Sequence, residues 1–255
     1  MTGNVRRLVG LLVLAVAAGL VGACARPAQP PLVWPSAGEP IVVASMTVGG
    51  GFVPYSWHLM EPPRITVYAD GAAVVDASKV LTLSQVEVSD LVRALREDLD
   101  GLGPTVEPGG GMQVSDAPTS VLRVRDEQGE LTAVSAYALG ILTSYPKRLL
   151  RARDRFGALA KRVEAGGTGY TSDRVRIVVE PRADQPASGL WPTGLALPPW
   201  REGGSLRTAD LTGSQALAVA AALPDQDWRS GSWPVLTGPD GQRYAVGWRY
   251  LLPEE

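Results

Sequence analysis

The stretch RITVYADGAAVVDASKVLTLSQVEVSDLVRALREDLDGL, residues 64–102, decides the fold class. Two short runs rich in β-branched residues, at 64–68 and 73–76, flank a turn that contains Asp70-Gly71. Aspartate followed by glycine between two such runs is a strong signal for a tight hairpin turn, because glycine tolerates positive φ. The first half of the stretch therefore predicts a pair of antiparallel strands.

The second half of the stretch predicts an amphipathic helix. Ser84 can cap its first turn and Glu87 can reach back to the cap, which together make a capping box. Leucine and valine then recur at helical spacing over 88–102. Arg96 and Asp100 stand four residues apart on the outer side and can form an ion pair.

The rest of the chain continues this mixture of hairpins and helices. Further strands are expected at 41–48, 120–125, 131–137, 174–180, 232–236 and 243–250, and further helices at 146–163 and 211–224. Strands and helices do not alternate as βαβ units. We therefore expect an α+β fold in which antiparallel sheet hairpins pack with about three amphipathic helices.

One short string occurs twice. Leu-Thr-x-Ser-Gln begins at Leu81 and again at Leu211, and each copy opens a helix that a hairpin follows. This pattern suggests a duplicated helix-plus-hairpin unit. The alternative is coincidence, because such strings are common at helix starts.

The N-terminus has the anatomy of an export signal. Arg6 and Arg7 precede an apolar run over 8–20, and Val21-Gly22-Ala23 leads into Cys24, the single cysteine of the chain. This arrangement resembles a bacterial lipoprotein signal peptide with its lipobox. The resemblance implies that 1–23 is a signal peptide, cleaved before Cys24. It also implies that the Cys24 sulfur carries a diacylglyceryl lipid with fatty acids such as palmitate.

Two other interpretations of this segment stay open. One is an ordinary secretory signal, and the other is a retained transmembrane helix. A span needs about 20 apolar residues, whereas Leu8 to Ala23 supplies 16. A diacyl anchor holds a protein to a membrane without any transmembrane helix.

Residues 24–40 follow as a proline-rich segment, which favours extended polyproline II and predicts a semi-rigid spacer. The globular body is expected over 41–255. Within it, 181–210 holds five prolines and is too long for a routine connection. It is either a functional loop or a boundary between subdomains.

Three further sequences resemble a known group. The run GGFVP at 50–54, YADG at 68–71 and the ending LLPEE at 251–255 are similar to those of uncharacterised actinobacterial lipoproteins. The resemblance implies an extracytoplasmic, lipid-anchored location in the cell envelope. It brings no activity and no site residues with it.

Composition excludes several classes of function. Without Arg6 and Arg7 the chain carries 22 basic and 26 acidic residues, so a nucleic-acid partner is not expected. With His58 as the single histidine and Cys24 consumed by lipid, a classical zinc site is excluded. We expect no cofactor and no metal.

One motif hints at an enzyme. Ser144-Tyr145-Pro146-Lys147 matches S-x-x-K, in which the serine opens a helix and the lysine one turn later takes its proton. The K-T-G and S-D-N motifs that accompany it in penicillin-binding enzymes are missing from the sequence. A carboxylate pair, as in glycoside hydrolysis, is a property of three dimensions that no sequence shows. An envelope hydrolase using Ser144 and Lys147, or such a pair, is the alternative function.

A basic stripe marks the predicted helix at 146–163. Within one sector of about 100° lie five cationic residues, namely Lys147, Arg148, Arg151, Arg155 and Arg162. Such a stripe could contact anionic lipid headgroups or an anionic wall polymer. The competing interpretation is a solvated helix face balanced by acidic neighbours.

The last third of the chain is rich in tryptophan. Trp233 and Trp248 lie on predicted strands and are expected in the core. Trp191 and Trp200 lie in the irregular stretch and are the better candidates for exposure, as contacts for a partner or a glycan. An inhibitor or accessory subunit acting through this loop is a second alternative.

Together these observations favour a non-enzymatic, lipid-anchored module on the extracytoplasmic face of the cell membrane. Its expected contacts are the membrane through the lipid on Cys24, and an anionic lipid, a wall polymer or an envelope protein through its folded body.

Overall fold

The structure is a computed structural model that describes residues 30–34, 38, 40–111, 114–126, 128–224 and 232–255. The chain divides into two units, Met1–Pro31 and Leu32–Glu255, and the fold described below is that of the second unit. The expected signal peptide over 1–23 and the lipidation site at Cys24 lie outside the described residues. Among the helices that the structure describes, none has the length and apolar character needed to span a bilayer.

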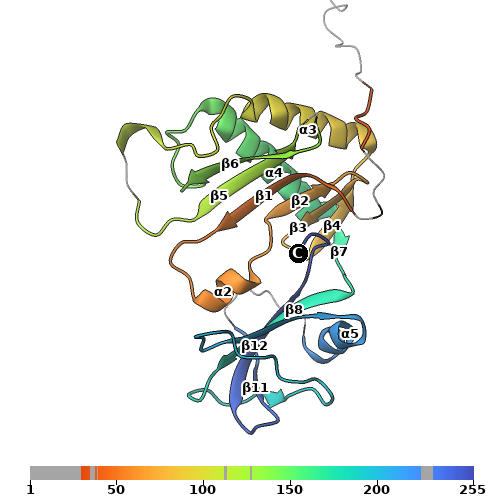
Figure 1. Cartoon of the computed structure of the whole chain (residues 1–255), viewed down its shortest axis with the longest axis vertical. Helices are drawn as coiled ribbons and strands as arrows, with labels where there is room; N and C mark the ends of the chain where they lie inside the picture. Colours follow the sequence, from red (N-terminus) through yellow and green to blue (C-terminus); the bar gives the residue numbers. More distant parts are fainter. Residues whose placement is uncertain (1–29, 35–37, 39, 112–113, 127, 225–231) are drawn as a thin grey trace, which may run out of the picture. The chain divides into compact units, whose positions relative to one another are not determined.

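Most of the first half of this unit folds into one antiparallel sheet with the strand order β6-β5-β1-β2-β3-β4-β7 (Figure 1). Its strands are β1 (Val42–Gly49), β2 (Ile65–Tyr68), β3 (Ala72–Val75), β4 (Lys79–Thr82), β5 (Thr119–Arg125), β6 (Leu131–Tyr137) and β7 (Thr168–Gly169). The predicted hairpin is confirmed as β2 and β3, which pair antiparallel. Gly71 turns the chain between them at φ +101° and donates its N–H to the Tyr68 carbonyl at 3.0 Å. We call this sheet the large sheet.

Two helices, α3 (Gln85–Leu99) and α4 (Lys147–Gly166), pack side by side on one face of the large sheet (Figure 1). The apolar stripes of both helices are buried against the strands in the main core, where residues such as Leu95 and Phe156 are fully covered. The predicted capping box is confirmed, because Ser84 accepts from the Glu87 N–H and Glu87 accepts from the Ser84 N–H.

The predicted pair of Arg96 with Asp100 is wrong. Arg96 turns away from its own helix and donates to the backbone carbonyls of Arg125 at 2.7 Å and Asp126 at 2.5 Å. Each carbonyl oxygen has two lone pairs, so carbonyls at the end of β5 can accept from the guanidinium. Arg96 therefore ties α3 to the large sheet.

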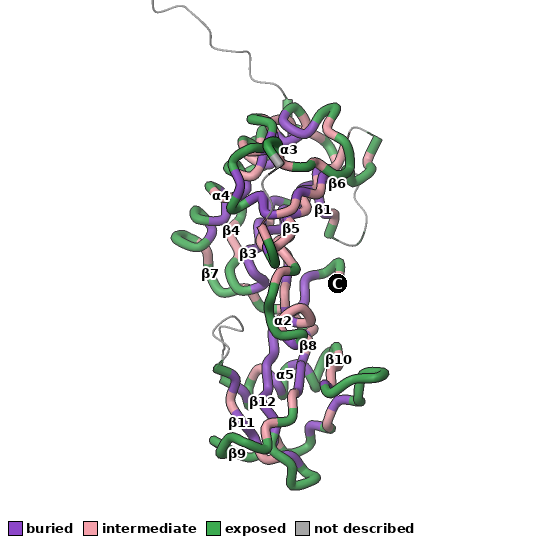
Figure 2. The backbone as a smooth tube through the Cα atoms, turned by 90° about the vertical axis from the view of Figure 1, so that its left-hand side faces the viewer, coloured by how far each residue is buried: buried purple, intermediate pink, exposed green. Residues whose placement is uncertain are grey.

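A second, smaller sheet has the order β10-β8-β12-β11-β9, in which the β11–β9 pair is parallel and the other pairs are antiparallel. Its strands are β8 (Arg174–Pro181), β9 (Gly189–Leu190), β10 (Arg207–Thr212), β11 (Val235–Thr237) and β12 (Arg243–Tyr250). Helix α5 (Gly213–Ala222) covers part of it with the buried Ala216 and Val219. Buried backbone runs along β8 and β12, the central strands (Figure 2).

The α+β fold with antiparallel hairpins is thus confirmed. Elements that the sequence did not predict are the short helix α2 (Tyr55–Met60), the strands β4, β7, β9 and β10, and a turn of 3-10 helix at Gly109–Gly111. Most of these strands are very short or lie at a sheet edge, so they bury little apolar surface and leave a weak pattern. The chain passes from one sheet to the other between β7 and β8, upstream of the stretch 181–210.

The repeated string leads to two different local structures. After Leu81, Ser84 is the N-cap of α3. After Leu211, the helix begins two positions earlier in the string, so Thr212 is the N-cap of α5 and makes no side-chain capping bond. A hairpin follows each helix. In the large sheet its first strand, β5, pairs with the preceding strand β1. In the small sheet its second strand, β12, pairs with the preceding strand β8. The two helix-plus-hairpin segments are therefore joined to their sheets in different ways.

Two residues of the expected spacer, Leu32 and Trp34, contact the folded body. The Leu32 N–H donates to Ser89 of α3 at 2.7 Å, and Arg96 lies over the Trp34 ring at 5.9 Å. Leu32 and Trp34 also pack against the main core. Leu32 and Trp34 are thus part of the fold.

Candidate functional site

The basic stripe of α4 faces helix α3. Arg151 and Arg155 both bind Asp98, with nitrogen–oxygen distances of 2.8 Å and 2.7 Å. The Asp98 side chain is only 2% exposed, so both guanidinium groups neutralise a buried carboxylate. These two residues join the helices.

Other members of the stripe are also engaged. Arg162 binds Glu87 at 2.7 Å, and Arg148 donates to the Asp100 carbonyl at 2.5 Å. Lys147 is exposed at the start of α4. The competing interpretation, a helix face balanced by acidic neighbours, therefore describes these contacts better than an open cationic surface does.

The geometry at Ser144 does not suit an S-x-x-K nucleophile. Helix α4 begins at Lys147 with Pro146 as its N-cap, so Ser144 lies before the helix and not in its first turn. The Ser144 carbonyl accepts a hydrogen bond from the Gly109 N–H at 2.7 Å, so Ser144 belongs to the connecting segment before the helix. The lysine consequently does not follow the serine by one helical turn.

The expectation that Trp191 is exposed is wrong. Trp191 is 8% exposed, belongs to the core of the small sheet and donates its indole N–H to the Leu195 carbonyl at 2.6 Å. A satisfied indole in an apolar core is stable there, although the surrounding loop is irregular. Trp200 is 47% exposed, but Arg207 covers its ring at 4.1 Å. Trp233 and Trp248 are buried, as predicted.

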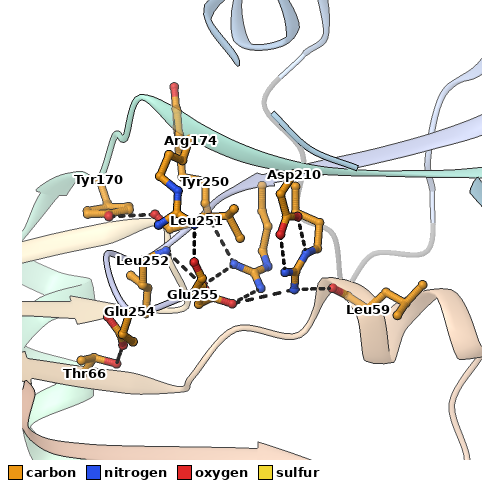
Figure 3. A network of polar contacts seen from close by, with 12 residues as sticks. Leu59, Thr66, Tyr170, Arg174, Asp210, Tyr250, Leu251, Leu252, Glu254 and Glu255 are labelled. Atoms are coloured by element: carbon orange, nitrogen blue, oxygen red, sulfur yellow. Dashed lines mark hydrogen bonds and ion pairs between the residues drawn. The ribbon is translucent and has the colours of Figure 1, made fainter. Parts of the chain in front are cut away.

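The ending of the chain forms a polar network where the two sheets meet (Figure 3). Glu254 accepts from the hydroxyls of Tyr68 at 2.6 Å and Thr66 at 3.4 Å, both on β2 of the large sheet. Glu255 binds Arg249 of β12 through two bonds of 2.8 Å and 2.6 Å. The segment thus connects the last strand of the small sheet to the large one.

Arg176 of β8 extends this network. It forms a two-pronged ion pair with Asp210 at 2.8 Å and 2.9 Å and lies 3.9 Å from Glu255. Arg176 also donates a hydrogen bond to the Leu59 carbonyl of α2 at 3.4 Å. The Arg176 hydrogen bonds lower the pKa of Asp210, with burial opposing them. Burial raises the pKa of Glu255, but the Arg249 guanidinium and other donors outweigh it, so this pKa lies below its usual range.

A groove lies at the C-terminal end of β1, beside the connection to α2. It has a volume of about 340 Å³ and an apolar lining from Val48, Phe52, Val53, Trp57 and Pro118. Phe52 is 90% exposed and Tyr55 58% exposed, although both are large apolar side chains. A contiguous apolar patch rimmed by polar residues is typical of an interaction site.

Glycine shapes this groove. Gly51 has φ +84°, and a Cβ there would lie 2.9 Å from the Asp116 carbonyl. The Phe52 N–H donates to that same carbonyl at 3.3 Å. The loop from Gly50 to Pro54 is therefore held against the segment before β5, with the Phe52 side chain exposed.

The charged groups of the groove are acidic. Glu61 and Asp116 are the charged residues in its lining. His58 lies 3.9 Å from Glu61. Among the residues that the structure describes, no group of His, Cys, Asp and Glu side chains could hold a metal ion. The run GGFVP that forms this groove is present in the sequence, but without coordinates nothing distinguishes an exposed phenylalanine from a core one.

No protein-family model, no curated protein and no solved structure matches the chain. The geometry described above is therefore the basis for assigning a function.

Proposed function

We propose that the chain is a lipid-anchored binding module of the extracytoplasmic membrane face, which binds a protein partner in the groove beside Phe52. The lipobox-like sequence around Cys24 supports the anchor. The observation that carries the binding function is the 90% exposed Phe52 at the edge of a 340 Å³ groove.

The partner's chemistry follows from the lining. Covering a phenylalanine side chain is worth about 1.5–3 kcal/mol, so an apolar side chain entering the groove would stabilise a complex. Glu61 and Asp116 favour a lysine or arginine next to it. We infer an extended peptide segment in which a basic residue adjoins a large apolar one.

A peptide-display library tests this chemistry on the full-length protein held in detergent. Selection should enrich peptides that combine a basic residue with an aromatic or aliphatic neighbour. Binding should be lost in Phe52→Ser and weakened in Glu61→Gln. Enriched peptides without either feature, or peptides that bind Phe52→Ser equally well, would contradict the groove as the binding site.

The anchor is tested separately. Cells supplied with an alkyne-bearing fatty acid should incorporate it into the wild-type protein, and Cys24→Ser should abolish the label. The wild-type protein should sediment with membranes and Cys24→Ser should not. Labelling that persists in Cys24→Ser would remove the lipoprotein assignment and leave the groove untouched.

A hydrolase is the second candidate, favoured by one observation. Glu61 and Asp116 line the same groove, and paired carboxylates are the machinery of glycoside hydrolysis. Release of reducing sugar from cell-wall glycan by the wild-type protein, abolished in both Glu61→Gln and Asp116→Asn, would establish it. Without such release, the carboxylates act in recognition alone.

A further inference from the structure

A second cavity lies apart from the groove, at the junction of the two sheets. It has a volume of about 240 Å³. Its walls come from the turn after β3 (Asp76, Ala77 and Ser78), the segment Gly169-Tyr170-Thr171, Ala220 of α5, and Trp248, Arg249 and Tyr250 of β12. Small-molecule sites occur preferentially at such junctions, because several elements can converge there on one ligand.

The aromatic side chains of this cavity meet edge to face. The Tyr170 and Tyr250 rings are 6.3 Å apart at 88°, and the Trp248 and Tyr250 rings are 5.2 Å apart at 81°. Rings at right angles leave no slot between two parallel faces. A flat base held between two rings would need such a slot, whereas a sugar ring lies against a single face.

The polar groups suit a ligand rich in hydroxyls. Ser78 and Thr171 add hydroxyls that can donate and accept. Asp76 adds a carboxylate to the lining, but Arg64 already binds it, so the cavity does not favour a charged ligand of either sign.

From this lining we infer a binding site for one neutral pyranose ring, such as a terminal sugar of a glycan. The volume limits the ligand, because pockets for drug-sized molecules measure about 300–1,000 Å³, and this one is smaller at about 240 Å³. Hydroxyls along one edge of the sugar bind the hydroxyl groups of Ser78 and Thr171. The C–H face of the ring lies on an aromatic side chain.

The site is independent of the groove beside Phe52, since the two share no lining residue. Either assignment can therefore fail without affecting the other.

The test uses the full-length protein in detergent with glucose, galactose, mannose and N-acetylglucosamine as probes, and adenosine as the planar competitor. Ligand-observed NMR should show saturable binding of at least one sugar, with a Kd on the order of 1 mM. Thr171→Trp and Ser78→Trp fill the cavity from exposed positions on two different segments, and each should weaken that binding about tenfold or more.

Matched variants make the result specific. Thr143→Trp places the same side chain at an exposed threonine outside the cavity and should leave sugar binding unchanged. Thr171→Val removes one hydroxyl at constant volume and should weaken binding even where a tryptophan variant fails to fold. The proposal is overturned if no sugar binds, if adenosine binds in their place, or if Thr171→Val and the folded tryptophan variants bind as tightly as the wild type.

Discussion

Tyr68 donates its hydroxyl to Glu254 at 2.6 Å, across 186 residues of sequence. Tyr68 belongs to the large sheet, and Glu254 follows the last strand of the small sheet. Leu252, which is fully buried beside Tyr68 and Val42, covers the face of the large sheet opposite its helices. The segment LLPEE is thus a structural clasp between the two sheets.

Glu255→Gln is expected to destabilise the protein by about 2–4 kcal/mol at neutral pH, because it leaves the buried Arg249 without its ionic partner. Chemical denaturation measures the loss. The matched control is Glu180→Gln, which removes a carboxylate paired with Arg182 at 3.0 Å near the surface and should cost less than about 1 kcal/mol. Equal costs for both variants would show that the clasp contributes no special stability.

The stability lost in Glu255→Gln should depend on pH. The pKa of Glu255 is lowered in the folded protein, so its contribution is fully present above the unfolded value of about 4.3. The contribution is lost as the pH falls through the folded pKa. The difference in unfolding free energy between the wild type and Glu255→Gln should therefore shrink below about pH 4.3. A difference that stays constant down to acid unfolding would contradict the ionic clasp.

Tyr68→Phe should cost about 1–2 kcal/mol, because Glu254 loses a donor in a partly buried site. Burial, followed by the Glu254 hydrogen bond, raises the pKa of Tyr68 above its ordinary value. The neutral phenol therefore stabilises the fold below about pH 10, and this stability is lost as the pH rises further. Alkaline unfolding of Tyr68→Phe should show less pH dependence than that of the wild type, and an unchanged profile would argue against the assignment.

Asp98→Asn should destabilise the α3–α4 contact by about 2–4 kcal/mol, because two arginines lose the charge of one buried carboxylate. Asp90→Asn provides the comparison: its side chain is 68% exposed and paired with Arg93 within the same helix, so we expect less than about 0.5 kcal/mol. Thermal unfolding followed by circular dichroism separates the two. If Asp98→Asn leaves the stability unchanged, the ion pairs do not hold Arg151 and Arg155 in place, and these arginines could bind a partner.

Gly71→Ala and Gly129→Ala distinguish backbone strain from a steric clash. Both glycines have positive φ, at +101° and +89°, so alanine at either should cost about 1 kcal/mol in conformational strain. A Cβ at Gly71 would also lie 2.3 Å from the Leu83 carbonyl, whereas nothing lies within 4 Å at Gly129. We expect Gly71→Ala to be the more destabilised by at least about 2 kcal/mol, measured by denaturant unfolding. Similar losses of stability in both variants would show that the Leu83 carbonyl does not clash with a side chain at position 71.

Periodicity predicted the elements that bury one face. The helix after Ser84 and the hairpin strands 120–125 and 131–137 agree with the structure because their apolar residues alternate or recur at the spacing of the element. Strand β10 was missed because its residues are half-buried or exposed at the edge of the small sheet. The helix α2 was missed because its six residues are too few to show a period.

The candidate sites depended on tertiary contacts that no local pattern contains. The stripe of α4 is real as a pattern, but Asp98 on another helix decides that Arg151 and Arg155 are neutralised. Trp191 lies in an irregular segment, yet the carbonyl of Leu195 satisfies its indole inside the core. Exposed Phe52 lies in a loop whose backbone contacts the Asp116 carbonyl, more than sixty residues further along the chain.

The most direct measurement is the affinity of the display-selected peptide for the wild type, Phe52→Ser and Val33→Ser. Phe52 and Val33 are 90% and 94% exposed, so both serine variants should keep their unfolding free energy within about 0.5 kcal/mol. The account predicts that Phe52→Ser binds at least about tenfold more weakly, while Val33→Ser binds like the wild type. Equal affinity of the wild type and Phe52→Ser would contradict the groove as the partner site.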